Sequence, residues 1–138
     1  MLTSRKAVVN DAAAITDLSH QLGYDISELQ TVTNLKYIIN SPSDETFVAD
    51  YDGNIVGWLQ VSKLIHLESD MFCEIAGLVV DAEHRSKGIG KHLLQQATKW
   101  AQLQNCKRIV VRTNVMRRDT HRFYNNNGFD EKKSRKYL

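Results

Sequence analysis

The hydrophobic residues of this chain follow two spacings, one typical of helices and one typical of strands. Apolar positions three and four residues apart predict helices over residues 10–22, 28–41 and 89–104, with a short fourth helix around 121–124. Runs of β-branched and aromatic residues predict strands over residues 2–8, 46–51, 54–63, 71–80, 107–113 and 129–138. The predicted order is therefore β-α-α-β-β-β-α-β-α-β.

Local signals locate several boundaries of these elements. Ser27 and Gln30 form a Ser-x-x-Gln capping box at the start of the second helix, and Pro42 ends that helix. Asp52 and Gly53 stand between two strand-like runs and predict a tight turn. The two strands around this turn should therefore form a hairpin.

The stretch of residues 72–94 combines a strand, a glycine-rich turn and a helix. The turn Gly88-Ile89-Gly90 leads directly into the third predicted helix. The first amides of a helix have no partner within the helix and carry partial positive charge. Arg85, Lys87 and Lys91 add full positive charges nearby. This stretch therefore predicts a binding site for a diphosphate.

Two common nucleotide-binding loops fit this turn poorly. A P-loop requires glycine at the position of Arg85 and Ser or Thr at the position of His92. A dinucleotide-binding loop requires a third glycine, where this chain has Leu93. The spacing Arg85-x-x-Gly88-x-Gly90 instead resembles the pyrophosphate loop of the GNAT superfamily of acetyl-CoA-dependent N-acetyltransferases, Arg/Gln-x-x-Gly-x-Gly/Ala.

The resemblance extends beyond the loop. The preceding strand, Glu-Ile-Ala-Gly-Leu-Val-Val-Asp, and the later Arg122-Phe123-Tyr124-x-x-x-Gly128-Phe129 are similar to those of the family, whereas Ser86 stands where many relatives have glycine. The resemblance implies one α/β (α+β) domain over residues 1–138 with the GNAT fold. Its mixed central sheet would have about six to seven strands and be splayed between the fourth and fifth strands.

The same resemblance implies acetyl-CoA as the co-substrate. In relatives, backbone groups near a bulge in the fourth strand pair with the pantetheine arm and donate to the acetyl carbonyl. Arg117 stands where many relatives have an asparagine that contacts this arm, and Asn114 could replace that contact. The residues expected to contact acetyl-CoA are Leu78, Val79, Val80, Arg85, Ser86, Lys87, Gly88, Ile89, Gly90, Lys91, Asn114 and Arg117.

Two residues are candidates for proton transfer. An alkyl amine has a pKa of about 10, so a base must remove a proton before it can attack. Glu74 is similar in position to the general base of the histone-acetylating branch, and strict alternation would put it on one face with Leu78 and Val80. The alternatives are that Glu74 faces solvent or pairs with Arg112, and that a chain of waters is the base. Tyr124 matches the family tyrosine that protonates the leaving thiolate, and its alternative role is packing.

The sequence leaves the acceptor open. A small amine such as an aminoglycoside, a polyamine or an amino-acid derivative is favoured, with direct attack in a ternary complex. The alternatives are a protein N-terminus or lysine, and a non-enzymatic CoA-binding regulatory domain. The resemblance puts Gly23, Tyr24 and Asp25 near the acceptor pocket, although Tyr24 could simply pack. The basic tail, residues 132–136, is short and next to one aromatic residue, so no nucleic-acid partner is expected.

Composition and charge agree with a small globular enzyme. The 138 residues contain no apolar run near the 20 residues of a membrane span and no signal-peptide pattern, so a cytoplasmic location is expected. The net charge of residues 1–69 is −5 and that of residues 70–138 is +7. The basic half suits a polyanion such as CoA, and the acidic half could favour a cationic acceptor.

Cysteine and histidine usage points away from metal or covalent chemistry. The five histidines and two cysteines show no metal-ligand spacing, so no metal is expected. Neither cysteine has the neighbours of a nucleophile, and both are expected to be reduced thiols. Dimers are common in the family, so a homodimer is compatible with this sequence.

Overall fold

The computed structural model describes residues 1–112, 121–130 and 135–138. Within these residues, six strands and four α-helices follow one another in the predicted order. The elements are β1 (Leu2–Lys6), α1 (Ala12–Gln21), α2 (Glu28–Ile39), β2 (Asp44–Tyr51), β3 (Asn54–Leu64), β4 (Phe72–Val80), α3 (Ile89–Leu103), β5 (Arg108–Val111), α4 (His121–Asn126) and β6 (Arg135–Tyr137), with short 3-10 turns at Val9–Asp11 and Ala82–His84.

The strands form one mixed sheet in the order β1-β2-β3-β4-β5-β6. Neighbouring strands are antiparallel except β4 and β5, which run parallel and are connected through α3. Asp52 and Gly53 have φ angles of 53° and 93°, as a tight turn between β2 and β3 requires. The predicted element order, mixed sheet and hairpin are confirmed. Of the last predicted strand, residues 129–138, the structure describes β6 over Arg135–Tyr137 and an isolated antiparallel bridge between Asp130 and Arg135.

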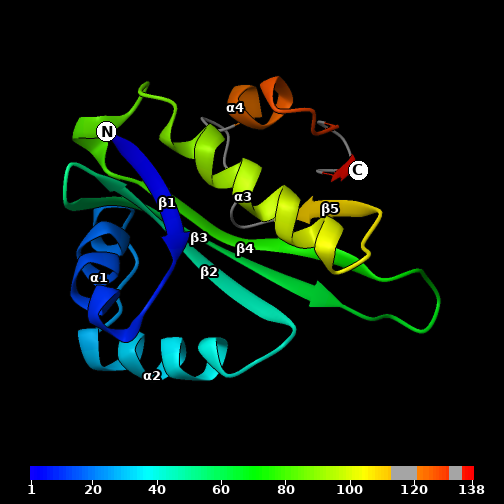
Figure 1. Cartoon of the computed structure of the whole chain (residues 1–138), viewed down its shortest axis with the longest axis horizontal. Coiled ribbons are helices and arrows are strands. Elements are labelled where there is room, and N and C mark those ends of the chain that lie inside the picture. Colours follow the sequence, from blue (N-terminus) through cyan, green and yellow to red (C-terminus); the bar gives the residue numbers. More distant parts are fainter. Residues whose placement is uncertain (113–120, 131–134) are drawn as a thin grey trace.

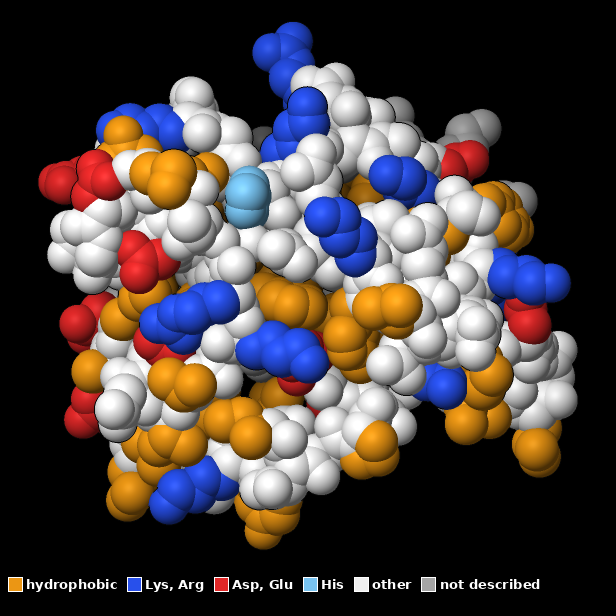
Figure 2. Space-filling model, viewed as in Figure 1, with side chains coloured by type: hydrophobic (Ala, Val, Ile, Leu, Met, Phe, Trp, Pro, Cys, Tyr) orange, Lys and Arg blue, Asp and Glu red, His pale blue; other side chains and the backbone are white. Residues whose placement is uncertain are grey.

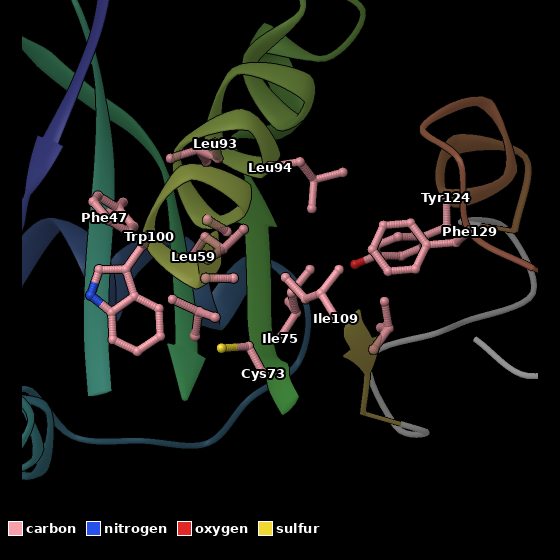
Figure 3. Close-up of a cluster of buried hydrophobic side chains, with 14 of the residues drawn as sticks. Phe47, Leu59, Cys73, Ile75, Leu93, Leu94, Trp100, Ile109, Tyr124 and Phe129 are labelled. Atoms are coloured by element: carbon pink, nitrogen blue, oxygen red, sulfur yellow. The ribbon is translucent and has the colours of Figure 1, made fainter. Parts of the chain in front are cut away.

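Helices cover both faces of the sheet (Figure 1). The α3 face carries the larger core, to which Leu59, Ile75 and Leu93 contribute fully buried side chains (Figure 3). The opposite face packs against α1 and α2 through a smaller cluster that includes Ile15 and Val48. The sheet therefore separates the molecule into two layers of helices.

A β-bulge in β4 changes which face its side chains reach. The pairing with β3 skips Ala76, which is an extra residue between Ile75 and Gly77. As a result Ile75 and Leu78 both contact the core beneath α3, whereas Glu74 lies on the face that α1 and α2 cover. The expectation that Glu74 shares a face with Leu78 and Val80 is wrong, because strict alternation does not survive an inserted residue.

β4 and β5 separate after three residue pairs. Cys73 to Ile75 pair with Ile109 to Val111, and the Arg112 N–H donates to the Ile75 carbonyl over 3.1 Å. Beyond this point, no described strand pairs with the edge of residues 76–80 that faces β5. The splay predicted between the fourth and fifth strands is present, and among the described residues it leaves a stretch of the β4 backbone edge without a strand neighbour.

Two cysteines that are distant in the sequence meet in the core. Cys73 lies on β4 and Cys106 follows α3, and their Sγ atoms are 3.1 Å apart, with both residues buried as free thiols. Burial, followed by the contact with Cys106, raises the pKa of Cys73, so the thiol rather than the thiolate is favoured at neutral pH. This contact could not be predicted from local sequence patterns, because 33 positions separate the two residues.

Neither a membrane-spanning helix nor a metal cluster is found in the part of the chain that the structure describes. No helix there combines the length and the apolar character needed to cross a bilayer. The same residues contain no group of three or more His, Cys, Asp or Glu side chains able to hold a metal ion.

Candidate active site

The turn between β4 and α3 has a backbone suited to binding an anion. Gly88, which precedes the first residue of α3, has a φ of 79°, and Ser86 has a φ of 67°. Left-handed residues in such a turn direct successive N–H groups toward one side, and the start of α3 adds unpaired N–H groups of its own. Ser86 therefore adopts a conformation that favours glycine, at the position where many GNAT relatives have glycine.

A cavity of about 490 Å³ opens beside this turn, along the part of β4 that has no described partner strand. Four parts of the chain meet around it. The lining residues are Leu22 and Tyr24 after α1, Leu78 and Val80 of β4, His84, Arg85, Ser86, Gly88, Ile89, Gly90 and Lys91 of the turn and α3, and Phe123, Tyr124, Asn126 and Asn127 of α4 and its end. The cavity is large enough for part of an extended ligand.

Close packing between α3 and α4 shapes one wall of the cavity. A Cβ atom added to Gly90 would lie 2.9 Å from Cζ of Phe123. The Phe123 ring therefore rests directly on the backbone of α3, and only glycine at this position leaves room for it. The second glycine of the loop thus determines how closely α4 approaches.

Tyr124 is a buried residue at the edge of the cavity. Its side chain is 2% exposed, and its ring packs edge-on against Phe123 and Phe129, with ring centroids 5.1 Å and 5.5 Å away. Its hydroxyl points away from α4 toward β4 (Figure 3). Burial, and to a lesser extent the nearby Tyr24, raises the pKa of Tyr124 above its ordinary value, so the phenol keeps its proton at neutral pH.

Most of the residues expected to contact acetyl-CoA lie on this cavity. They are Leu78, Val80, Arg85, Ser86, Gly88, Ile89, Gly90 and Lys91. Val79 is buried opposite Trp58 and does not line the cavity. Lys87 also lies elsewhere, with its Nζ 5.2 Å from the centre of the Tyr51 ring. Asn114 and Arg117 lie outside the described residues.

Glu74 lies near the splay but does not line the cavity. It is half-buried on the face of α1 and α2, paired in register with Ser62 of β3 and Val110 of β5. Among the ion pairs between described residues, none includes Glu74. Its carboxylate therefore faces the opposite side of the sheet from the Tyr124 hydroxyl.

Sequence reasoning missed several lining residues. His84 directly precedes Arg85, so its place beside the loop was the available signal. Leu22, Asn126 and Asn127 gave no signal as cavity residues, because only the folded chain brings the end of α1 and the end of α4 to the same cavity.

Two basic side chains lie on the wall of the cavity. Arg85 and Lys91 are the two fully charged basic side chains among its described lining residues. In the view of Figure 2, further Lys and Arg side chains are spread over the surface rather than gathered in one place. Among the described residues, Arg85 and Lys91 are therefore the part of the basic charge of residues 70–138 that lies at the cavity.

Comparison with known proteins identifies the class to which this fold and cavity belong. The family model "Acetyltransferase (GNAT) family" matches residues 12–129. This match covers most of the chain, and the chain therefore belongs to the acetyltransferase (GNAT) family.

Individual relatives are more distant. The chain is 28% identical to N-alpha-acetyltransferase 30 of Xenopus laevis, over 90% of this chain and 46% of that protein. It is 25% identical to YjgM of Escherichia coli, an uncharacterized N-acetyltransferase, over 89% of this chain and 72% of that protein. The chain spans half or less of the length of several curated relatives that it matches.

One solved structure shows the extent of the shared fold. Aminoglycoside N-acetyltransferase AAC(6')-Iy, in complex with CoA, superposes with a TM-score of 0.83 over 94% of this chain and 88% of that chain. The two sequences are 17% identical, so this similarity concerns the fold alone.

Proposed function

We propose that this protein is an acetyl-CoA-dependent N-acetyltransferase that acts on a primary amine of a small molecule, by direct attack in a ternary complex. The cavity is the observation that carries the proposal. It brings an anion-binding turn, an edge of β4 without a described partner strand and a buried tyrosine together on one surface. Membership of the GNAT family supports this class of reaction.

The cavity residues suit the two ends of acetyl-CoA, which supplies a thioester whose carbonyl carbon accepts the amine. Arg85, Lys91 and the N–H groups at the start of α3 are suited to hold its diphosphate. The edge of residues 77–80 suits the amides of its arm, as a neighbouring strand would. A backbone N–H near Leu78 would stabilise the oxyanion that develops during attack.

Glu74 and Tyr124 are suited to two separate proton transfers. Because they lie on opposite faces of the sheet at the splay, Glu74 can take the amine proton from the side of α1 and α2. Tyr124 can donate its proton to the departing sulfur from the side of α3, since burial keeps the phenol protonated. The amine acceptor would then approach past the end of α1, where Leu22 and Tyr24 line the cavity.

A second acceptor class is supported by one comparison. The match to N-alpha-acetyltransferase 30 covers 90% of this chain. A protein N-terminus is therefore the main alternative to a small amine. A small amine and a protein N-terminus differ in size, so assays with both kinds of acceptor distinguish the two classes.

The experiment that tests the function is acetyl transfer to a panel of amines. Aminoglycosides, polyamines, free amino acids, N-terminal peptides and lysine peptides would each be incubated with acetyl-CoA, and the products weighed by mass spectrometry. We expect acetylated product with a small amine. Product with peptides alone would favour the alternative acceptor, and binding of acetyl-CoA without any product would favour a regulatory domain.

A further inference from the structure

A polar network lies between the anion-binding turn and the end of α1, and none of the roles given above uses it. Gln21 Nε2 donates to Asp81 Oδ1 over 3.0 Å, and Gln21 Oε1 accepts from the Ala82 N–H over 2.9 Å. Asp81 Oδ2 lies 2.6 Å from His84 Nδ1. The network therefore joins the last residue of α1 to the 3-10 turn that precedes the loop.

The network fixes the orientation of the His84 ring. A carboxylate only accepts hydrogen bonds, so the nitrogen that faces Asp81 must carry a proton. Nε2 is then the ring nitrogen left for another partner. The His84 side chain is 26% exposed and lines the cavity, while its ring packs against Tyr51 with centroids 5.7 Å apart. His84 thus lines the cavity with a ring whose orientation the network fixes, and Nε2 is the ring nitrogen that the network does not use.

Not every basic residue of the loop lies on the cavity, so His84 is a further candidate for a contact with an anion there. Lys87, the third basic residue of the loop, has its Nζ over the Tyr51 ring and does not line the cavity. His84 lines it directly beside Arg85. The hydrogen bond from Gln21 and the contact with His84 lower the pKa of Asp81 despite partial burial, so its carboxylate stays charged at neutral pH. A charged Asp81 holds the imidazole in place.

We propose that His84 is a binding residue for the phosphate groups of the acetyl donor, acting through Nε2, and that Asp81 and Gln21 are its positioning residues. This inference rests on the proposed function, because it takes acetyl-CoA as the ligand of the cavity. With Nδ1–H directed to Asp81, Nε2 can donate only when the ring is an imidazolium, so the inference is that His84 binds a phosphate oxygen in this form, with an Nε2–H donor and a positive charge. Gln21 also holds the end of α1, and with it Leu22 and Tyr24, against the same turn.

Two substitutions of His84 test the roles of its two ring nitrogens separately. His84→Asn places an amide N–H where Nδ1 meets Asp81 but removes Nε2, the nitrogen to which the phosphate contact is assigned. His84→Gln places an amide N–H near the position of Nε2. We expect His84→Asn to weaken CoA binding about tenfold, as the loss of a hydrogen bond to a charged group does. His84→Gln should recover part of this loss.

The choice of ligand distinguishes a phosphate contact from a general structural effect. CoA affinity would be measured by titration calorimetry, and kcat/KM would be measured for acetyl-CoA and for S-acetylpantetheine, which has the same thioester without phosphates. His84→Asn should lower kcat/KM for acetyl-CoA and leave that for S-acetylpantetheine unchanged. His66→Asn, at the opposite end of β4, is the matched control and should change neither value.

The outcomes are separable. Unchanged CoA affinity in His84→Asn would overturn the inference, and so would an equal loss with both donors. A Gln21→Ala variant, which leaves His84 in place, should show the same selective loss to a smaller extent, and its absence would also count against the inference. Wild-type protein that does not bind CoA at all would instead overturn the proposed function.

Discussion

At the scale of single residues, burial decides the chemistry of Tyr124. The ring is enclosed by Phe123 and Phe129, and removal of water disfavours the charged phenolate more than the neutral phenol. A phenol that keeps its proton can donate that proton to a departing thiolate. The same packing that makes Tyr124 a core residue therefore also keeps it in the protonated form that the proposed acid role requires.

Tyr124→Phe should separate these two roles. The ring packing would be kept while the proton is lost, so we expect kcat to fall about 100-fold and CoA affinity to stay unchanged. In the wild type, the raised pKa should keep Tyr124 protonated between pH 8 and about 10. We therefore expect no decrease in kcat over this range from loss of the Tyr124 proton. Tyr37→Phe, at an exposed position on α2, is the control. Wild-type turnover in Tyr124→Phe would show that another group protonates the sulfur.

The backbone conformation of Ser86 leads to a prediction about the stability of the protein. Its φ of 67° is unfavourable for serine, so Ser86→Gly should raise the free energy of unfolding by about 0.5–1 kcal/mol. The gain is partial because glycine also loses more entropy on folding. Ser86→Ala keeps a Cβ atom and should give no gain. Denaturant melts of the three proteins would measure this, and equal stability of Ser86→Gly and the wild type would argue against strain at this position.

At the scale of elements, the approach of α4 to α3 depends on Gly90. Gly90→Ala would push a Cβ atom into the Phe123 ring, and we expect a loss of about 1–3 kcal/mol in stability from overpacking. Phe123→Leu removes the ring atoms that meet this Cβ, so the double variant should lose less than the sum of the two single changes. Thermal or denaturant unfolding of the four proteins measures this coupling, and strict additivity would contradict the contact.

The elements also show how far the sequence predicts the structure. Hydrophobic spacing, the capping box at Ser27 and the Asp52-Gly53 turn are local signals, and they predicted the element order correctly. The bulge at Ala76 depends on how β4 pairs with β3, and no local pattern encodes it. Alternation therefore put Glu74 on the wrong face. The glycine loop was predicted from its spacing, whereas the network of Gln21, Asp81 and His84 required the fold.

At the scale of the whole molecule, the sheet separates the side of α3 from the side of α1 and α2. The α3 face carries the glycine turn and most of the cavity wall, to which the end of α1 adds Leu22 and Tyr24, and the other face carries α1, α2 and Glu74. The splay between β4 and β5 is where the two faces come together. A donor on one face and an amine on the other could therefore meet there.

This arrangement predicts a salt dependence. The proposed anchors for the donor phosphates, Arg85 and Lys91, are basic, so raising the salt concentration from about 0.05 M to about 0.5 M should weaken CoA binding severalfold through screening. Pantetheine, which has no phosphate, should bind with an affinity that salt changes little. Calorimetry at several salt concentrations measures both. Equal salt effects on the two ligands would place the phosphates away from these cations.

The most direct test of the central claim is a crystal structure of the protein with CoA. We expect the diphosphate to lie against the turn of residues 85–91, the arm along residues 77–80 and the sulfur within reach of the Tyr124 hydroxyl. CoA bound elsewhere, or bound with its sulfur directed away from the splay between β4 and β5, would contradict this claim.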